Sequence, residues 1–111
     1  GDLFVKIRVK DHHLFGQSGG DLTLDVPITF DEAALGADIA VPTLEGGSVK
    51  MRIPAGTPSG KTFRLRGKGG KGDLLVTAVI VVPDDLSDDQ KAAVEAFAAA
   101  ATDSPRAHLG V

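Results

Sequence analysis

The chain has 111 residues, of which 42% are hydrophobic and 24% are charged, and this composition is typical of one soluble globular domain rather than of a disordered segment. Its formal net charge of −3 argues against a general affinity for nucleic acid or for anionic membranes. The sequence contains no cysteine, which excludes disulfides and thiolate metal sites, and it contains no apolar run near the ~18 residues of a membrane span.

The N-terminal residues predict a strand followed by a linker. Apolar and basic residues alternate across residues 3–10, which indicates a strand with one buried face. The opening sequence GDLFV is similar to GDLLV at residues 72–76, so we expect residues 1–10 to be the closing strand of an earlier unit and the chain to be a piece of a longer protein. The polar residues 11–20 end in a glycine pair, which predicts a link between two units.

The longest regular alternation runs over residues 21–30 and predicts a strand whose buried face ends at Phe30. Pro27 cannot donate a backbone hydrogen bond, so we expect this strand to lie at a sheet edge or to be bulged there. A one-turn helix is expected next, with Asp31 as its N-cap and Gly36 in the left-handed position after its end.

Three short strands separated by turns are predicted in the middle of the chain. Residues 41–53 predict a hairpin that turns at Gly46 and Gly47, because glycine readily adopts the positive φ of tight turns. Val49, Met51 and Ile53 alternate with Lys50 and Arg52, which predicts that the three apolar residues form its buried face. Residues 54–60 contain two prolines and two glycines, which excludes a helix and predicts a wide turn. Residues 62–66 then alternate again as a third strand.

A loop and then a last, apolar strand are predicted over residues 67–82. Residues 67–72 are rich in glycine and lysine and predict a flexible loop. Residues 73–82 are apolar on both faces, which predicts a strand that is covered on both sides or that presents one face to a partner.

A helix is predicted from residue 87 to residue 101. Ser87 and Gln90 have the spacing of a capping box, and the alanine-rich run that follows strongly favours a helix. Four residues at helical spacing form a narrow apolar stripe: Val94, Phe97, Ala98 and Ala101. The stripe either packs on the sheet of its own chain or docks on another chain. Residues 102–111 predict a flexible tail.

No arrangement of residues in the sequence predicts an enzyme or a metal site. Residues 56–62 are similar to a phosphate-binding loop, but the spacing is too short and a strand pattern follows where a helix is required. We therefore interpret them as a structural turn. His12 and His13 are adjacent and would point to opposite sides of an extended chain, so they make a poor chelate.

A run of basic residues follows the turn, and no acidic residue interrupts it. Its members are Lys61, Arg64, Arg66, Lys68 and Lys71. The run is consistent with a solvated edge strand, with a contact for an acidic peptide, or with a nucleic-acid surface. Binding of single-stranded nucleic acid also requires aromatic platforms, and Phe63 is the only nearby aromatic residue.

Several segments together resemble one protein family. FDEAALG, VPTLEG, RIPAGTPSGKTFRLRGKG and GDLLV occur in the order seen in the C-terminal, client-binding half of DnaJ-type J-domain co-chaperones, and the resemblance covers residues 1 to 97. It implies a bacterial parent and a mainly β fold: a small two-sheet β-sandwich with one short helix, plus a C-terminal α-helix. The implied units are the end strand of a first C-terminal domain (1–10), a linker (11–20), the second C-terminal domain (21–85), a dimerisation helix (86–101) and a flexible tail (102–111).

The resemblance also implies a function without catalysis. The expected protein is a cytoplasmic co-chaperone of protein folding and the stress response, which forms a homodimer, binds unfolded polypeptides and delivers them to a DnaK-type chaperone. No cofactor is expected in this chain, and any zinc of the parent protein is expected outside it. Neither nucleic acid nor a membrane is an expected partner, and the alternative function is a nucleic-acid-binding β-barrel that uses residues 61–71.

Three sets of site residues follow from these interpretations. The expected dimer contacts are Leu86, Val94, Phe97, Ala98 and Ala101. The expected client contacts lie on the outer face of the last strand and are Leu75, Val79 and Val81. The candidate contacts for an acidic peptide are Lys61, Arg64, Arg66 and Lys68.

Overall fold

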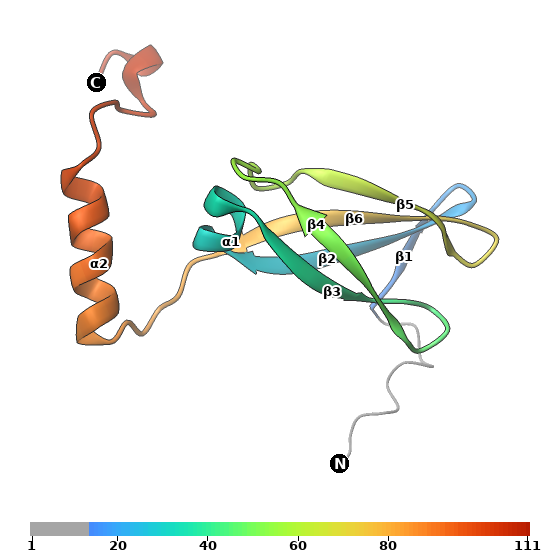
Figure 1. The fold of residues 1–111 in the computed structure, drawn as a ribbon. Helices are drawn as coiled ribbons and strands as arrows, with labels where there is room; N and C mark the ends of the chain where they lie inside the picture. Colours follow the sequence, from blue (N-terminus) through green and yellow to red (C-terminus); the bar gives the residue numbers. More distant parts are fainter. Residues whose placement is uncertain (1–13) are drawn as a thin grey trace.

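The computed structural model describes residues 14–111, so the expected strand at residues 1–10 lies outside the described residues. A four-stranded sheet has the order β1 (Gly16–Ser18), β2 (Asp21–Thr29), β6 (Gly72–Val81) and β5 (Thr62–Gly69). β2 and β6 are parallel, and the other neighbouring strands are antiparallel. A hairpin of β3 (Ala37–Pro42) and β4 (Ser48–Ile53) forms the second sheet and covers one face of the first (Figure 1).

The two sheets and one short helix, α1 (Phe30–Leu35), confirm the predicted mainly β fold. The alternative of a β-barrel is wrong, because the four-stranded sheet is open, with β1 and β5 as its edges. β1 also lies inside the segment that was expected to be a linker, and it pairs with the first residues of β2. β1 reaches only as far as Thr23, so among the described residues β2 has no partner on that side beyond Thr23. Pro27 therefore lies at an open edge of the sheet, as predicted.

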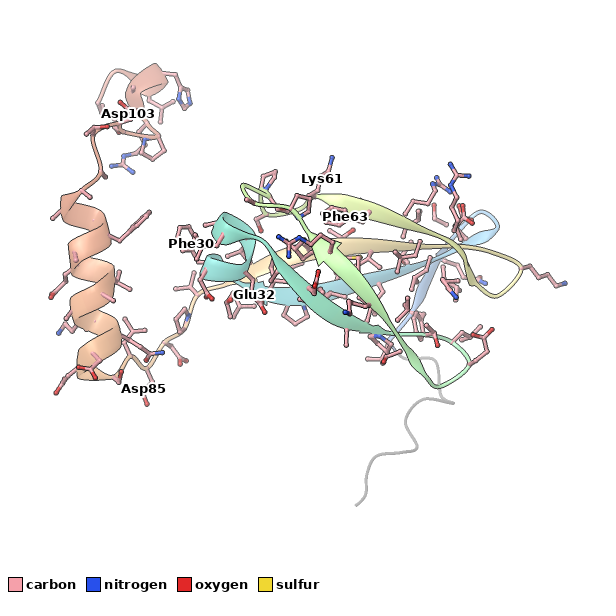
Figure 2. The ribbon with its side chains drawn as sticks, viewed as in Figure 1. Phe30, Glu32, Lys61, Phe63, Asp85 and Asp103 are labelled. Carbon is pink, nitrogen blue, oxygen red and sulfur yellow. The ribbon has the colours of Figure 1, made fainter. Side chains whose placement is uncertain are left out.

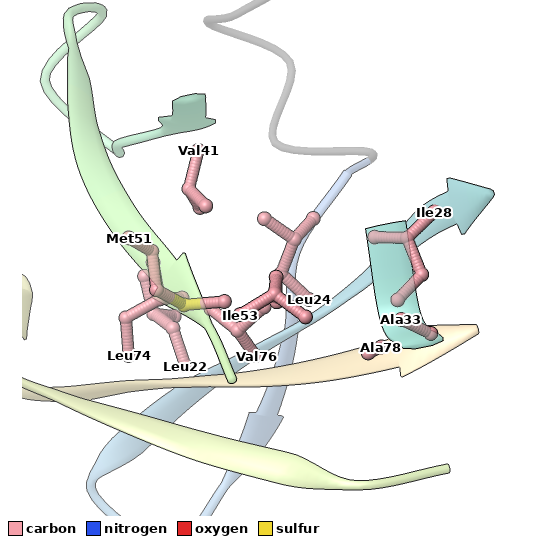
Figure 3. Close-up of a cluster of buried hydrophobic side chains, with 10 residues drawn as sticks. All are labelled: Leu22, Leu24, Ile28, Ala33, Val41, Met51, Ile53, Leu74, Val76 and Ala78. Atoms are coloured by element: carbon pink, nitrogen blue, oxygen red, sulfur yellow. The ribbon is translucent and has the colours of Figure 1, made fainter. Parts of the chain in front are cut away.

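The core lies between the four-stranded sheet and the hairpin (Figure 3). Alternate residues of β2 and β6 point into it, as their period of two predicts. The buried apolar residues are Leu22, Leu24, Ile28, Ala33, Val41, Met51, Ile53, Leu74, Val76 and Ala78. The hairpin contributes Val41, Met51 and Ile53, which confirms the predicted inward face of residues 49–53.

Helix α1 begins earlier than the sequence predicted. Thr29, not Asp31, is its N-cap: the Glu32 N–H donates to Thr29 Oγ1 at 3.3 Å, and the Thr29 N–H donates to Glu32 Oε1 at 2.9 Å. This capping box turns the chain at the end of β2, so Phe30 leaves the buried face of the strand and is 51% exposed. Gly36 has the expected positive φ, at 87°, but its ψ of 149° lies outside the left-handed helical region.

The turn at residues 54–60 forms backbone hydrogen bonds with helix α1 and with strand β6. The N–H groups of Gly56 and Thr57 donate to the Ala33 carbonyl at 2.8 and 2.9 Å, which satisfies a carbonyl that the helix end would leave unpaired. Farther along, the Gly60 N–H donates to the Ala78 carbonyl, and strand β5 follows. The segment is therefore a structural turn, as interpreted from the sequence.

The glycine-rich segment at residues 67–72 is ordered by the sheet, so the prediction of a flexible loop is wrong. β5 continues through an irregularity to Gly69, which pairs with Gly72 of β6 across a tight turn. The Gly67 N–H donates to Asp73 Oδ1 at 2.8 Å and holds the irregularity in place.

The C-terminal helix α2 (Asp88–Ala99) begins where the sequence predicts. The Gln90 N–H donates to Ser87 Oγ at 3.1 Å, and the Ser87 N–H donates to Gln90 Oε1 at 2.9 Å. The helix ends two residues before the predicted Ala101, and the tail contains a 3₁₀ helix, η2 (Ala107–Leu109). α2 stands beside the α1 end of the sandwich, and none of its residues is buried (Figure 1).

Candidate functional site

An apolar groove lies between α2 and the end of the sandwich. We call it the helix groove; its apolar lining includes Phe30, Val81, Val82, Leu86, Val94 and Phe97. The Phe30 and Phe97 rings meet edge to face, with centroids 5.4 Å apart and planes at 68°. Figure 2 places Phe30 on the side of α1 that faces the helix. Phe97 is nevertheless 62% exposed, so this contact leaves most of its ring open to solvent.

The groove gathers three of the five residues predicted to make dimer contacts. Leu86, Val94 and Phe97 line it, whereas Ala98 does not and Ala101 lies beyond the end of α2. The sequence did not indicate Phe30 or Val82 as residues of this groove, and Val81 was expected to contact clients. Strand alternation had placed Phe30 in the core. The signal that could have found Phe30 is the T-x-x-E capping box at Thr29, which starts a helix at Phe30.

The outer face of β6 carries the three residues predicted to contact clients. Leu75, Val79 and Val81 alternate with the buried positions of the strand, so they point away from the core. Leu75 is partly covered, while Val79 and Val81 are 40% and 46% exposed. The strand register places Pro27 next to Val79, which extends the apolar surface onto β2. Val81 also lines the helix groove, so the two apolar surfaces are continuous.

The basic run borders β5, but its members differ in their surroundings. Arg64 Nη1 donates to Asp73 Oδ2 at 2.7 Å and lies 3.6 Å from Asp21 Oδ2. The hydrogen bond to Asp73 is the main cause that raises the pKa of Arg64. Two carboxylates therefore compensate the Arg64 charge, and a contact of this side chain with an acidic peptide stays a prediction.

Asp73 connects the strands at this end of the sheet. Its N–H donates to Asp21 Oδ1 at 2.8 Å, and its carboxylate accepts from the Gly67 N–H and from Arg64. The hydrogen bond from Gly67 and then that from Arg64 lower the pKa of Asp73, because both stabilise the charged carboxylate. The cluster is thus a structural link between β2, β5 and β6.

The other basic residues are exposed and have a different environment. Within residues 14–111, Lys61, Arg66 and Lys68 have no carboxylate within 4.0 Å. Phe63 is half-buried and packs against the core, so it does not supply a platform for a nucleic-acid base.

Neither metal chemistry nor a membrane span has support in the described part of the chain. Residues 14–111 contain no cluster of three or more histidine, cysteine, aspartate or glutamate side chains that could hold a metal ion. His12 and His13 lie outside the described residues. No helix of the described residues is both long and apolar enough to cross a membrane.

Comparison with known proteins identifies relatives over nearly the whole chain. Residues 1–83 match the family model described as DnaJ C terminal domain. The chain is 54% identical over 101 residues to Chaperone protein DnaJ 2 of Cutibacterium acnes, which covers 86% of this chain and 27% of that protein. It is 49% identical over 116 residues to Chaperone protein DnaJ 1 of Streptomyces coelicolor, which covers 98% of this chain and 29% of that protein. The chain therefore spans less than a third of the length of these relatives.

Proposed function

Because the chain belongs to the DnaJ C-terminal domain family, we propose that it is the part of a DnaJ co-chaperone that joins two copies through α2 and contributes an apolar surface to the binding of unfolded polypeptides. For the whole protein, we propose delivery of these clients to a DnaK-type chaperone in the cytoplasm. The names of the relatives describe chaperones, which supports a role without catalysis.

The exposed apolar face of α2 is the observation that carries the homodimer. The helix is well capped, yet Leu86, Val94 and Phe97 remain open to solvent. Full burial of one such side chain stabilises a complex by roughly 1.5–3 kcal/mol. A second copy supplies the same apolar face, and a two-fold pairing would bury both sets at once. The alanine-rich remainder of α2 offers little further apolar surface, so we expect a dimer of modest affinity.

The homodimer is tested by the solution mass of the protein, measured by light scattering across a range of concentrations. We expect a dimer for residues 1–111 and a monomer for residues 1–85. Phe97→Asp should also give a monomer, because the dimer would bury an unpaired charge. Ala96→Asp is the matched control, since Ala96 is on the same helix but does not line the helix groove. A Phe97→Asp variant that remains dimeric at micromolar concentration would refute the proposal.

Client binding is proposed for the outer face of β6. Unfolded chains expose apolar segments, and an apolar sheet face without a covering layer in the described residues can bind them. Two such faces on one dimer would gain affinity from the high effective concentration of the second site. Leu75 and Val79 are the residues to substitute in the test. Val81 also lines the helix groove, so its substitution could affect both client binding and dimerisation.

The test compares two double variants in their ability to suppress the aggregation of a client. Leu75→Ala with Val79→Ala should weaken suppression, whereas Thr23→Ala with Thr77→Ala, on the same face of the sheet, should leave it nearly unchanged. Light scattering of a heat-denatured client measures the effect, and the solution mass verifies that both variants keep the same oligomeric state. Equal suppression by the two variants would exclude the outer face as the client surface.

A further inference from the structure

The free edge of β5 combines unpaired backbone groups with a row of cations. β5 is an outer strand of the four-stranded sheet, and within residues 14–111 β6 is its only partner. An exposed edge strand is a template for another extended chain. The close ion pairs of Asp21 and Asp73 are with Arg64. The charge of Arg66 also helps to lower the pKa of Asp73, but within residues 14–111 neither Lys61, Arg66 nor Lys68 has a carboxylate within 4.0 Å.

The hydrogen-bond alternation fixes which backbone groups of β5 face outward. At the start of the strand, the Ala78 N–H donates to the Lys61 carbonyl at 2.9 Å, so residue 61 bonds toward β6. Backbone groups of an antiparallel strand then alternate between its two sides. Thr62 and Arg64 accordingly direct their N–H and C=O groups away from β6. The 2.9 Å hydrogen bond between Thr62 Oγ1 and Thr77 Oγ1 agrees with this, because side chains are closest at positions that do not exchange backbone bonds.

The charges select the kind of strand that can pair there. Lys61 lies at the start of β5, and Arg66 and Lys68 lie toward its end, all of them exposed. These cations would attract carboxylates placed along an extended peptide and would repel a basic one. A peptide also matches the edge better than nucleic acid, since the edge offers backbone hydrogen bonds and Phe63 is turned toward the core. Figure 2 shows Lys61 and Phe63 at this strand, with Lys61 pointing away from the sandwich.

We propose that the β5 edge is a docking site for an acidic, extended peptide segment, which adds to the sheet as a further strand. Thr62 and Arg64 supply the backbone hydrogen bonds, while Lys61, Arg66 and Lys68 bind the carboxylates. Arg64 acts only through its backbone, because its guanidinium remains bound to Asp73 and Asp21. The site is independent of the proposed dimer, since no residue of β5 lines the helix groove.

The test uses a fluorescent peptide of about ten residues in which glutamate and threonine alternate, a length that matches a typical strand. Binding to the full chain is measured by fluorescence anisotropy. The combined variant Lys61→Gln, Arg66→Gln and Lys68→Gln should weaken binding about tenfold, as expected for the loss of several exposed ion pairs. The matched control Lys50→Gln, Lys91→Gln and Arg106→Gln removes the same charge elsewhere and should change binding less than about twofold.

Two further measurements separate strand addition from a purely ionic contact. A peptide with alternate backbone amides N-methylated keeps its charge but cannot pair along its whole length, so it should lose most of its binding. In NMR spectra of the unmodified chain, the amide signals of Thr62 and Arg64 should shift on addition of the peptide. Undiminished binding of the methylated peptide would overturn the proposal, as would unchanged binding by the three-residue edge variant.

A single-stranded oligonucleotide of similar charge tests the other class of partner. We expect it to bind more weakly than the peptide and without shifts at Thr62 and Arg64. An oligonucleotide that binds more tightly than the peptide, with an affinity that falls steeply with salt, would assign the basic edge to nucleic acid and overturn the peptide site.

Discussion

The sandwich and helix α2 differ in where their apolar side chains find partners. In the sandwich, Val41, Ile53, Leu74 and Val76 are almost fully buried by the same chain. In α2, Val94 and Phe97 remain mostly exposed, although the helix is equally well defined by its capping box. A correctly predicted helix or strand therefore leaves open whether its apolar face is covered within one chain or by a second chain. The following experiments test whether the two regions are as independent as their burial indicates.

The largest expected difference is between the loss of stability on truncation of a core residue and that on truncation of an exposed residue. Ile53→Ala removes a fully buried side chain and should lower the free energy of unfolding by roughly 2–5 kcal/mol, because a cavity is left in the core. Val94→Ala in α2 should change the stability of the sandwich by less than about 0.5 kcal/mol. Urea denaturation followed by circular dichroism, at a concentration where the protein is monomeric, measures both. A similar loss for the two variants would mean that α2 belongs to the cooperative unit of the sandwich.

A smaller effect is expected where the backbones of two strands approach closely. A Cβ at Gly72 would clash with the Gly20 carbonyl and with Asp21, whereas a Cβ at Gly20 would meet nothing within 4 Å. Gly72→Ala should therefore cost roughly 1–3 kcal/mol of stability, and Gly20→Ala should be close to neutral. The midpoint of thermal unfolding distinguishes them. Equal midpoints would show that the contact of residues 20–21 with Gly72 relaxes without cost.

The two capping boxes allow the same substitution to be made in each region. Thr29→Ala should destabilise the sandwich by about 1 kcal/mol, since α1 contributes Ala33 to the core. Ser87→Ala should lower the helical signal of α2 without a shift in the unfolding of the sandwich. Circular dichroism at 222 nm and the chemical shifts of core methyl groups, such as those of Val76, report on the two regions separately. Coupled changes in both signals after Ser87→Ala would contradict their independence.

The smallest effect is a pH dependence at the β5 end of the sandwich. The folded-state pKa of Asp73 lies below the ordinary value of 3.8, so its contribution to stability is present above that value and is lost as pH falls below it through the folded pKa. Asp73→Asn should therefore make stability less dependent on pH in this acidic range. Urea midpoints at neutral pH and at pH values below 3.8 measure the difference. An identical pH dependence in the variant would show that other carboxylates dominate acid unfolding.

Local patterns predicted the regular elements well but failed at their junctions. The alternation in β6 correctly divided Leu74, Val76 and Ala78 from the outward residues, because a strand has a strict period of two. The same rule misplaced Phe30, because the capping box of Thr29 and Glu32 ends the strand there and starts a helix. Where two local signals compete, alternation alone does not decide which one the chain follows.

The candidate site was predicted in part for a related reason. Val94 and Phe97 were found from their helical spacing, which depends only on residues within two turns. Their neighbours Phe30 and Val82 in the helix groove lie outside the helix, and no helical period relates them to Val94 and Phe97. In the same way, the basic run was visible as a run, but the pairing of Arg64 with Asp21 required β2 and β5 to lie on either side of β6.

The sequence by itself determined the strands from β2 to β6, the capped C-terminal helix, the inward face of the hairpin and the resemblance to a family, because each depends on the types and spacing of residues that are close along the chain. Only the tertiary structure decided the parallel pairing of β2 with β6, the order imposed on residues 67–72 by Asp73, and the exposure of α2 beside Phe30. These features depend on contacts between residues as far apart as Asp21 and Asp73, and such contacts arise when apolar faces are buried together, which no local period records.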